Sequence, residues 1–188
     1  MKYQTNEFRK GLKLEVDGQP NIIVENQFIK PGKGQPFNKV RLKNLVTGNV
    51  IERTYKSGES VEGADMEERT MQYLYTDGSV FHFMDNQNHD QVEIKKDQLG
   101  ETWKWIQESM DCEVLFYKGN PLTVEIPNFA IIEITYCEPG VKGNTATGAT
   151  KPATLETGAE INVPLFVEQG DKVKVDTRTG EYVERYKG

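Results

Sequence analysis

The sequence predicts an all-β protein built from three small barrels or sandwiches. Short strand patterns recur along the whole chain, turn signals separate them, and a helical pattern is credible in one place only. Two breaks divide the 188 residues: the small polar segment 57–63, and Ile126-Pro127-Asn128, where a strand pattern ends at a proline. We therefore expect three domains, residues 1–63, 64–128 and 129–188, of about 60 residues each, a size that favours packing between neighbours.

The expected strands alternate apolar and polar residues and end at turn residues. The clearest hairpin is 73–84, in which two aromatic-rich strands flank Asp77-Gly78. A similar turn, Asp17-Gly18, follows the first strand, and Lys118-Gly119-Asn120 separates a later pair. In chain order the other expected strands are 13–16, 21–29, 40–46, 114–117, 122–126, 129–136, 161–167 and 172–175.

The single helix is expected from Leu99 to Met110. Trp103, Ile106 and Met110 have the three-and-four spacing of one helical face, although Gly100 makes the start uncertain. Trp103 and Trp105 both fall in this segment, and aromatic residues at helical spacing favour a place in the core over a ligand platform.

The net charge of −6 is distributed unevenly. The expected domains carry +4, −8 and −2 in chain order, and no acidic residue occurs between Glu25 and Glu52. That stretch contains five basic residues, which are Lys30, Lys33, Lys39, Arg41 and Lys43. Such a segment is typical of a local polyanion contact or of a solvated strand face, and charge alone leaves both readings open.

Several classes of protein are excluded. The longest apolar runs are four residues, at 114–117 and 129–132, whereas a membrane-spanning helix needs about 20. The first seven residues lack the apolar core of a signal peptide, so we expect a cytoplasmic protein. Cys112 and Cys137 have no CxxC or His-partner spacing, and His82 and His89 fit structural or surface positions. We expect no metal site, no cofactor and no catalytic residue.

The sharpest local feature is the segment Lys30-Pro31-Gly32-Lys33-Gly34-Gln35-Pro36-Phe37, between two strand patterns. Pro31-Gly32 has the residues of a type II turn, in which the glycine takes a positive φ. Lys33 then stands between two glycines at the loop tip, with no neighbouring side chain to cover it. The pattern indicates a single long cation projecting from a hairpin.

We compare three other roles for Lys33 with the sequence: a phosphate-binding lysine, a Schiff-base lysine, and an exposed lysine in an ordinary turn. A phosphate-binding P-loop requires GxxxxGK[ST] before a helix, and this segment has neither. A Schiff-base lysine requires desolvation, which a glycine-flanked tip does not provide. From the residues alone, an ordinary turn with an exposed lysine remains open.

The loop resembles the tip of bacterial elongation factor P. The last third resembles the same family more specifically, from Lys151-Pro152-Ala153-Thr154 through 163–167 and 173–176 to the segment 177–185. Glu62-Gly63-Ala64-Asp65 and the hairpin at 75–84 add to the likeness. The resemblance covers essentially the whole chain in family order.

This resemblance implies an SH3/KOW-like barrel followed by two OB folds, in an L-shaped arrangement that mimics tRNA. It also implies a monomeric, non-enzymatic factor that binds the ribosome between the P and E sites and acts on stalling at consecutive prolines. Lys33 matches the lysine that a modifying enzyme extends, typically with β-lysine and sometimes with hydroxylation. The surrounding residues Lys30, Pro31, Gly32, Gly34 and Gln35 would contact the P-site peptidyl-tRNA, and Pro36 departs from the alanine common in relatives.

The resemblance implies two further contacts. Gly143-Asn144-Thr145 matches the loop that approaches the E-site codon, with Asn144 in place of the usual aspartate. Tyr182 and Arg185 match positions associated with tRNA contact, although a solvated strand end explains them equally simply. Two alternatives remain: a divergent paralogue with another ribosomal client, and a general OB-fold protein that binds single-stranded nucleic acid.

Overall fold

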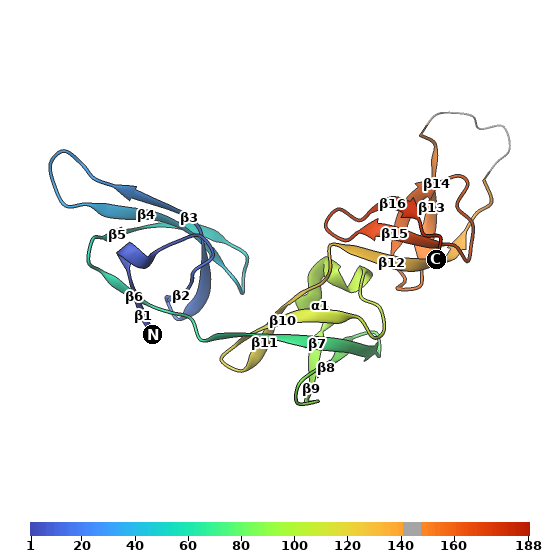
Figure 1. The fold of residues 1–188 in the computed structure, drawn as a ribbon, viewed down its shortest axis with the longest axis horizontal. Helices are drawn as coiled ribbons and strands as arrows, with labels where there is room; N and C mark the ends of the chain where they lie inside the picture. The colour runs from blue at the N-terminus through green and yellow to red at the C-terminus, as the bar shows by residue number, and fades with distance from the viewer. Residues whose placement is uncertain (141–147) are drawn as a thin grey trace. The chain divides into compact units, whose positions relative to one another are not determined.

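The computed structural model describes residues 1–140 and 148–188 (Figure 1), and the chain divides into two compact units. The first unit comprises residues 1–68 and 115–122, and the second comprises residues 69–114 and 123–188. Antiparallel strands dominate both, so the predicted all-β class is confirmed. None of the helical segments within the described residues has the length and apolarity to cross a membrane.

The N-terminal part of the chain forms a four-stranded sheet in the order β2-β3-β4-β5 and a two-stranded sheet of β1 and β6. Its core is a cluster in which Leu14, Ile23, Val40 and Leu42 are fully buried. The alternation seen in the sequence places these side chains on one face of the strands. The elements are β1 (Lys2–Gln4), η1 (Thr5–Glu7), β2 (Lys13–Val16), β3 (Gln19–Ile29), β4 (Phe37–Asn44), β5 (Val50–Lys56) and β6 (Ser60–Glu62).

Two five-stranded sheets follow along the chain. The middle sheet has the order β11-β10-β7-β8-β9, and the last sheet has the order β14-β13-β12-β15-β16. The middle elements are β7 (Met66–Thr76), β8 (Val80–Asp85), β9 (Gln91–Lys95), α1 (Lys96–Leu99), η2 (Gly100–Lys104), β10 (Asp111–Tyr117) and β11 (Asn120–Glu125). The last strands are β12 (Phe129–Cys137), β13 (Thr150–Leu155), β14 (Glu160–Pro164), β15 (Lys172–Asp176) and β16 (Glu181–Arg185).

The predicted hairpin at 73–84 is confirmed as β7 and β8, which pair up to Thr76↔Phe81. The Asp77 carboxylate organises its turn. Its Oδ1 accepts hydrogen bonds from the Val80 amide at 2.8 Å, the Ser79 amide at 2.8 Å and the Ser79 hydroxyl at 2.9 Å. These donors favour the charged form and lower the pKa of Asp77 from 3.8 to about 2.

We therefore expect NMR titration of the Asp77 carboxyl carbon to give a pKa of about 2. Because the folded pKa lies below the unfolded value of about 3.9, this carboxylate stabilises the fold above that pH. Its contribution is lost as the pH falls through about 2. A titration midpoint at or above 3.8 would show that the turn donors do not hold the charge.

The helix predicted from Leu99 to Met110 is wrong. A single α-helical turn, α1, ends at Leu99, and the 3-10 segment η2 ends at Lys104. Gly100, the first residue of η2, has a φ of +56°, and Ser109 has a φ of +66°, so the α-helical path is interrupted near both ends of the predicted helix. The apolar spacing reflects burial of side chains in irregular backbone, since Ile106 is 4% exposed without belonging to a helix.

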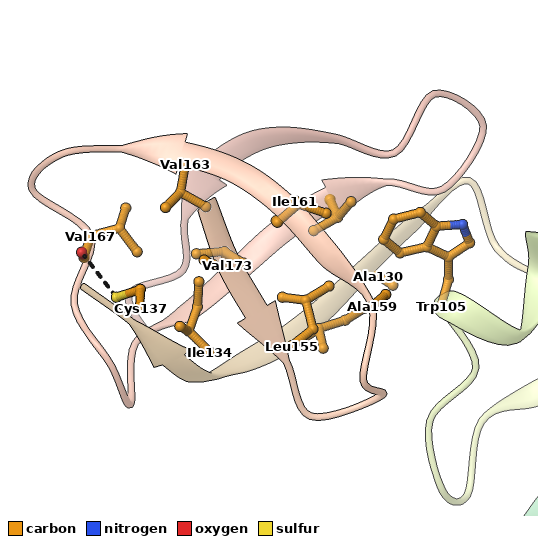
Figure 2. Close-up of a cluster of buried hydrophobic side chains, with 13 residues drawn as sticks. Trp105, Ala130, Ile134, Cys137, Leu155, Ala159, Ile161, Val163, Val167 and Val173 are labelled. Carbon is orange, nitrogen blue, oxygen red and sulfur yellow. Dashed lines mark hydrogen bonds between the residues drawn. The ribbon is translucent and has the colours of Figure 1, made fainter. Parts of the chain in front are cut away.

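Trp105 lies in the core of the last sheet, as Figure 2 shows. Its ring joins a buried cluster that includes Ile132, Ile134, Leu155 and Val173. The core position expected for Trp105 is thus confirmed, and Trp103 is only half-buried. The segment around η2 therefore supplies part of the core of the last sheet.

Two hydrogen bonds reinforce this packing within the second unit. The Thr157 hydroxyl donates to the Lys104 carbonyl at 2.7 Å, and Gln107 Nε2 donates to Glu156 Oε1 at 2.7 Å. Apolar burial and polar contacts thus join the segment after α1 to the β13–β14 turn.

Candidate functional site

The β3–β4 hairpin carries the predicted lysine loop. Its last strand pair is Ile29↔Phe37, so residues 30–36 form the loop. Lys33 is exposed at the tip, and a Cβ added to Gly32 would meet no atom within 4 Å. Within the part of the chain that the structure describes, the Lys33 ammonium makes neither an ion pair nor a hydrogen bond. It is thus free to bind a partner or to be modified.

The type II turn predicted at Pro31-Gly32 is wrong. The positive φ in this loop belongs to Gly34, at +107°, and not to Gly32. A Cβ at Gly34 would lie 3.8 Å from Pro31 Cγ, so the chain folds back toward the proline ring after it has passed Lys33. Glycine is favoured at position 34 because L-residues with a side chain are strained at such φ values.

The two glycines make a matched pair for mutation. We expect Gly34→Ala to lower the free energy of unfolding by about 1 kcal/mol and to shift the amide NMR signals of the loop, because the positive φ becomes strained. Gly32→Ala, in open space, is expected to leave both nearly unchanged. Chemical denaturation and an amide spectrum check this, and equal effects of the two variants would contradict it.

A buried polar contact supports the β3–β4 strands next to the loop. Asn38, which is 4% exposed, donates from Nδ2 to Asn26 Oδ1 at 2.9 Å. Asn26 in turn donates from Nδ2 to the Phe8 carbonyl at 2.8 Å. The two asparagines are diagonal neighbours in the β3–β4 register, and the chain of bonds ties the hairpin to the segment before β2. The sequence analysis predicts neither residue as part of the site: Asn26 lies within the predicted strand 21–29, and Asn38 lies just before the predicted strand 40–46.

The positive charge of the hairpin is partly neutralised. Lys39 Nζ lies 3.1 Å from Glu52 Oε1, and Arg41 Nη1 lies 3.4 Å from Glu25 Oε2. Among the described residues, Lys30 and Lys33 have no such carboxylate partner. Lys43, near the other end of β4, has none among them either, so two of the three unpaired cations of this segment lie at the loop, where they favour an anionic partner.

Tyr182 and Arg185 lie on β16, the edge strand of the last sheet, in the second unit, whereas the lysine loop belongs to the first unit. Tyr182 packs against the core cluster of that sheet, and burial raises the pKa of its hydroxyl. Arg185 Nη1 lies 3.6 Å from Asp171 Oδ2, and its guanidinium lies 5.8 Å from the Phe166 ring. These internal contacts give both residues a structural role, and their contact with tRNA stays a prediction.

The predicted codon-contacting residues Gly143, Asn144 and Thr145 lie outside the described residues. The described chain on either side makes close contacts in and beside the last sheet. Lys151 Nζ donates to the Glu138 carbonyl at 2.7 Å, and a Cβ on Gly140 would lie only 2.6 Å from the Leu165 carbonyl oxygen.

No group of three or more His, Cys, Asp or Glu residues forms a metal-binding arrangement within residues 1–140 and 148–188. Cys112 and Cys137 are buried and unbonded to each other. Burial raises the pKa of the Cys112 thiol to about 12, which keeps it protonated and unreactive at neutral pH.

Solved structures share the fold at low sequence identity. Eukaryotic translation initiation factor 5A from Methanococcus jannaschii is 21% identical with a TM-score of 0.56, over 64% of this chain and 90% of that one. A translation initiation factor eif-5a family protein from Naegleria fowleri is 15% identical with a TM-score of 0.54, over 66% of this chain and 94% of that one.

Three family models match the chain in succession. They are the elongation factor P KOW-like domain at residues 4–61, the elongation factor P OB domain at residues 66–124, and the elongation factor P C-terminal domain at residues 131–185. The KOW-like match contains the entire lysine loop. Since the three matches together span nearly the whole sequence in order, the chain belongs to the elongation factor P family.

Proposed function

We propose that this translation elongation factor binds the ribosome between the P and E sites and stimulates peptide-bond formation at consecutive prolines through a modified Lys33. One observation carries the proposal. Lys33 is exposed between two glycines at the tip of the β3–β4 loop, without an ionic partner among the described residues, inside a KOW-like elongation factor P domain. Such a side chain is available to a modifying enzyme first and to the ribosome afterwards.

The physical task suits a thin cationic loop. Proline is a constrained nucleophile with a fixed φ, and a peptidyl-tRNA that ends in proline is badly oriented for transfer. Holding reactants in a productive geometry lowers a barrier without chemistry by the protein. A cation at the loop tip binds phosphate and sugar oxygens of the P-site tRNA. β-Lysylation of Lys33, with hydroxylation as a further step, lengthens the side chain and adds an amine.

The remaining loop residues shape and flank the contact. Gly32 and Gly34 keep the tip narrow, Pro31 packs near Gly34, and Lys30 and Gln35 are exposed beside them. The codon loop at 143–145, together with Tyr182 and Arg185, forms a second contact with the tRNA and the E-site codon. In this proposal the chain has three domains, residues 1–63, 64–128 and 129–188, and the first of them carries Lys33. The factor acts as a monomer and needs no cofactor.

The test is reconstituted translation of a message that encodes three consecutive prolines, with a proline-free message as control. Protein from its native cells is expected to relieve the stall on the first message and to leave the second unchanged. Recombinant protein whose intact mass shows an unmodified Lys33 is expected to act more weakly.

Either of two outcomes would contradict the proposal and favour a different function. Ribosome binding by fully modified protein, without proline-specific rescue, would indicate a paralogue with another ribosomal client. Salt-sensitive binding to free oligonucleotides without ribosome binding would indicate a general single-strand-binding protein. The net charge of −10 over residues 64–188 weighs against the latter.

A further inference from the structure

The second unit contains a groove that the lysine loop does not touch. It has a volume of about 450 Å³, within the range of ligand sites. The side chains that define this aromatic–acidic groove are Tyr73, Tyr75, Phe81, Trp103, Glu108 and Glu156. All of them belong to the second unit.

The aromatic walls present accessible ring surface. Tyr75 is 56% exposed and stacks on His82, with ring centroids 4.3 Å apart and planes 19° apart, which fixes its orientation. Trp103 is half-buried and already holds one cation, because Lys96 Nζ lies 3.9 Å from the centre of its ring. His82 and Lys96 each occupy one face of these rings, so a further cation would bind at the opposite faces by its attraction to the π-electrons.

The charged side chains that line the groove, Glu108 and Glu156, are both acidic, and the cation nearest its aromatic wall is Lys96, on the Trp103 ring. Among the described residues, the Glu156 carboxylate accepts from Gln107 Nε2 at 2.7 Å and from the Glu133 amide at 3.4 Å, and both bonds end on Oε1. Oε2 therefore keeps its capacity to accept from a ligand. The net charge of −10 over residues 64–188 reinforces the local field.

We propose that the aromatic–acidic groove binds an arginine side chain from a basic segment of a partner protein. A planar guanidinium stacks on Tyr75 or Trp103 and donates to Glu108 or Glu156, which combines two contacts that a lysine cannot match. A nucleic acid would also find rings for stacking, but its phosphates would meet carboxylates instead of cations. The inference is independent of the function of Lys33, since no loop residue lines the groove.

The test adds a short capped peptide, Gly-Arg-Arg-Gly, to the full chain. NMR signals of the protein report where the peptide binds and how tightly. A second peptide with citrulline in place of arginine keeps the shape and removes the charge. We expect the arginine peptide to shift the signals of Tyr75, Trp103 and Glu108, and the citrulline peptide to bind at least about tenfold more weakly. Equal binding of the two peptides, or shifts outside the groove, would overturn the proposal.

Matched variants localise the effect. Glu108→Gln and Tyr75→Ala are each expected to weaken binding of the arginine peptide about threefold, whereas Tyr75→Phe retains it. Glu181→Gln is the control, because it removes the same charge from an exposed β16 residue outside the groove. If Glu181→Gln weakens binding as much as Glu108→Gln, only the overall charge matters and the site is wrong. Tighter binding of a uridine hexanucleotide in the groove would assign it to nucleic acid instead.

Discussion

Lys33→Ala is expected to remove at least nine-tenths of the rescue of translation at consecutive prolines, about the tenfold lower limit derived below, while leaving the fold intact. The side chain is exposed and unpaired among the described residues, so its loss should change the free energy of unfolding by less than about 0.5 kcal/mol. A hydrogen bond to a charged group contributes about 1.5–3 kcal/mol. Loss of one such contact in the transition state corresponds to a roughly 10–150-fold slower reaction. The measurement is the rate of peptide-bond formation on a proline-run message.

Two further variants separate charge from modification. Lys33→Arg keeps a cation but offers no amine for β-lysylation, so we expect it to lack the added mass and most of the rescue. Lys43→Ala is the matched control, since it removes an exposed cation near the opposite end of β4. Rescue that largely survives in Lys33→Ala would contradict the mechanism, and full rescue by Lys33→Arg would show that charge suffices without modification.

The strands that the sequence predicts correctly are those with strong local signals. The turns at Asp17-Gly18, Asp77-Gly78 and Lys118-Gly119 combine positive-φ residues with flanking alternation, so local backbone preference and burial agree there. The sequence analysis does not predict β5, because the adjacent apolar residues Val50 and Ile51 at its start break the alternation, and in the fold both are exposed. β13 contains Pro152, a residue depleted in strands, and forms by pairing on both sides with β12 and β14.

The part of the candidate site that depends on local sequence was predictable as well. The exposure of Lys33 follows from its glycine neighbours, which are visible in the sequence. The choice of Gly34 over Gly32 for the positive φ depends on how the loop closes over Pro31, and both glycines permit it. The bond between Asn26 and Asn38 depends on a cross-strand register that includes a bulge between Ile23 and Glu25. The aromatic–acidic groove likewise brings Glu156 to the middle sheet from a distant part of the chain.

Trp105→Ala is expected to lower the free energy of unfolding of the second unit by about 3–5 kcal/mol, the usual cost of truncating a buried tryptophan. The indole is 6% exposed and packs closely over Gly180, whose added Cβ would lie 3.2 Å from Trp105 Cζ2. Denaturant titration with separate NMR signals for each unit measures the effect. The signals of the first unit, exemplified by Leu42, are expected to keep their midpoint.

Gly180→Ala probes the same contact from the opposite side. Its φ of +77° and the nearby ring both oppose a methyl group, so we expect destabilisation of about 1–3 kcal/mol. Gly170→Ala is the control, because it has a similar φ of +89° but open space around the added Cβ. A larger loss for Gly180→Ala than for Gly170→Ala isolates the contribution of the Trp105 ring; equal losses would show that backbone strain alone acts.

The tryptophan also links stability to the proposed function without involving Lys33. Trp105 and Tyr182 pack on the same core cluster, so the indole helps to fix the sheet that carries the second proposed contact. Trp105→Ala is therefore expected to reduce proline rescue even when intact mass shows that Lys33 is fully modified. Full rescue by this variant, together with the measured loss of stability, would mean that the last sheet contributes little to the action of the loop.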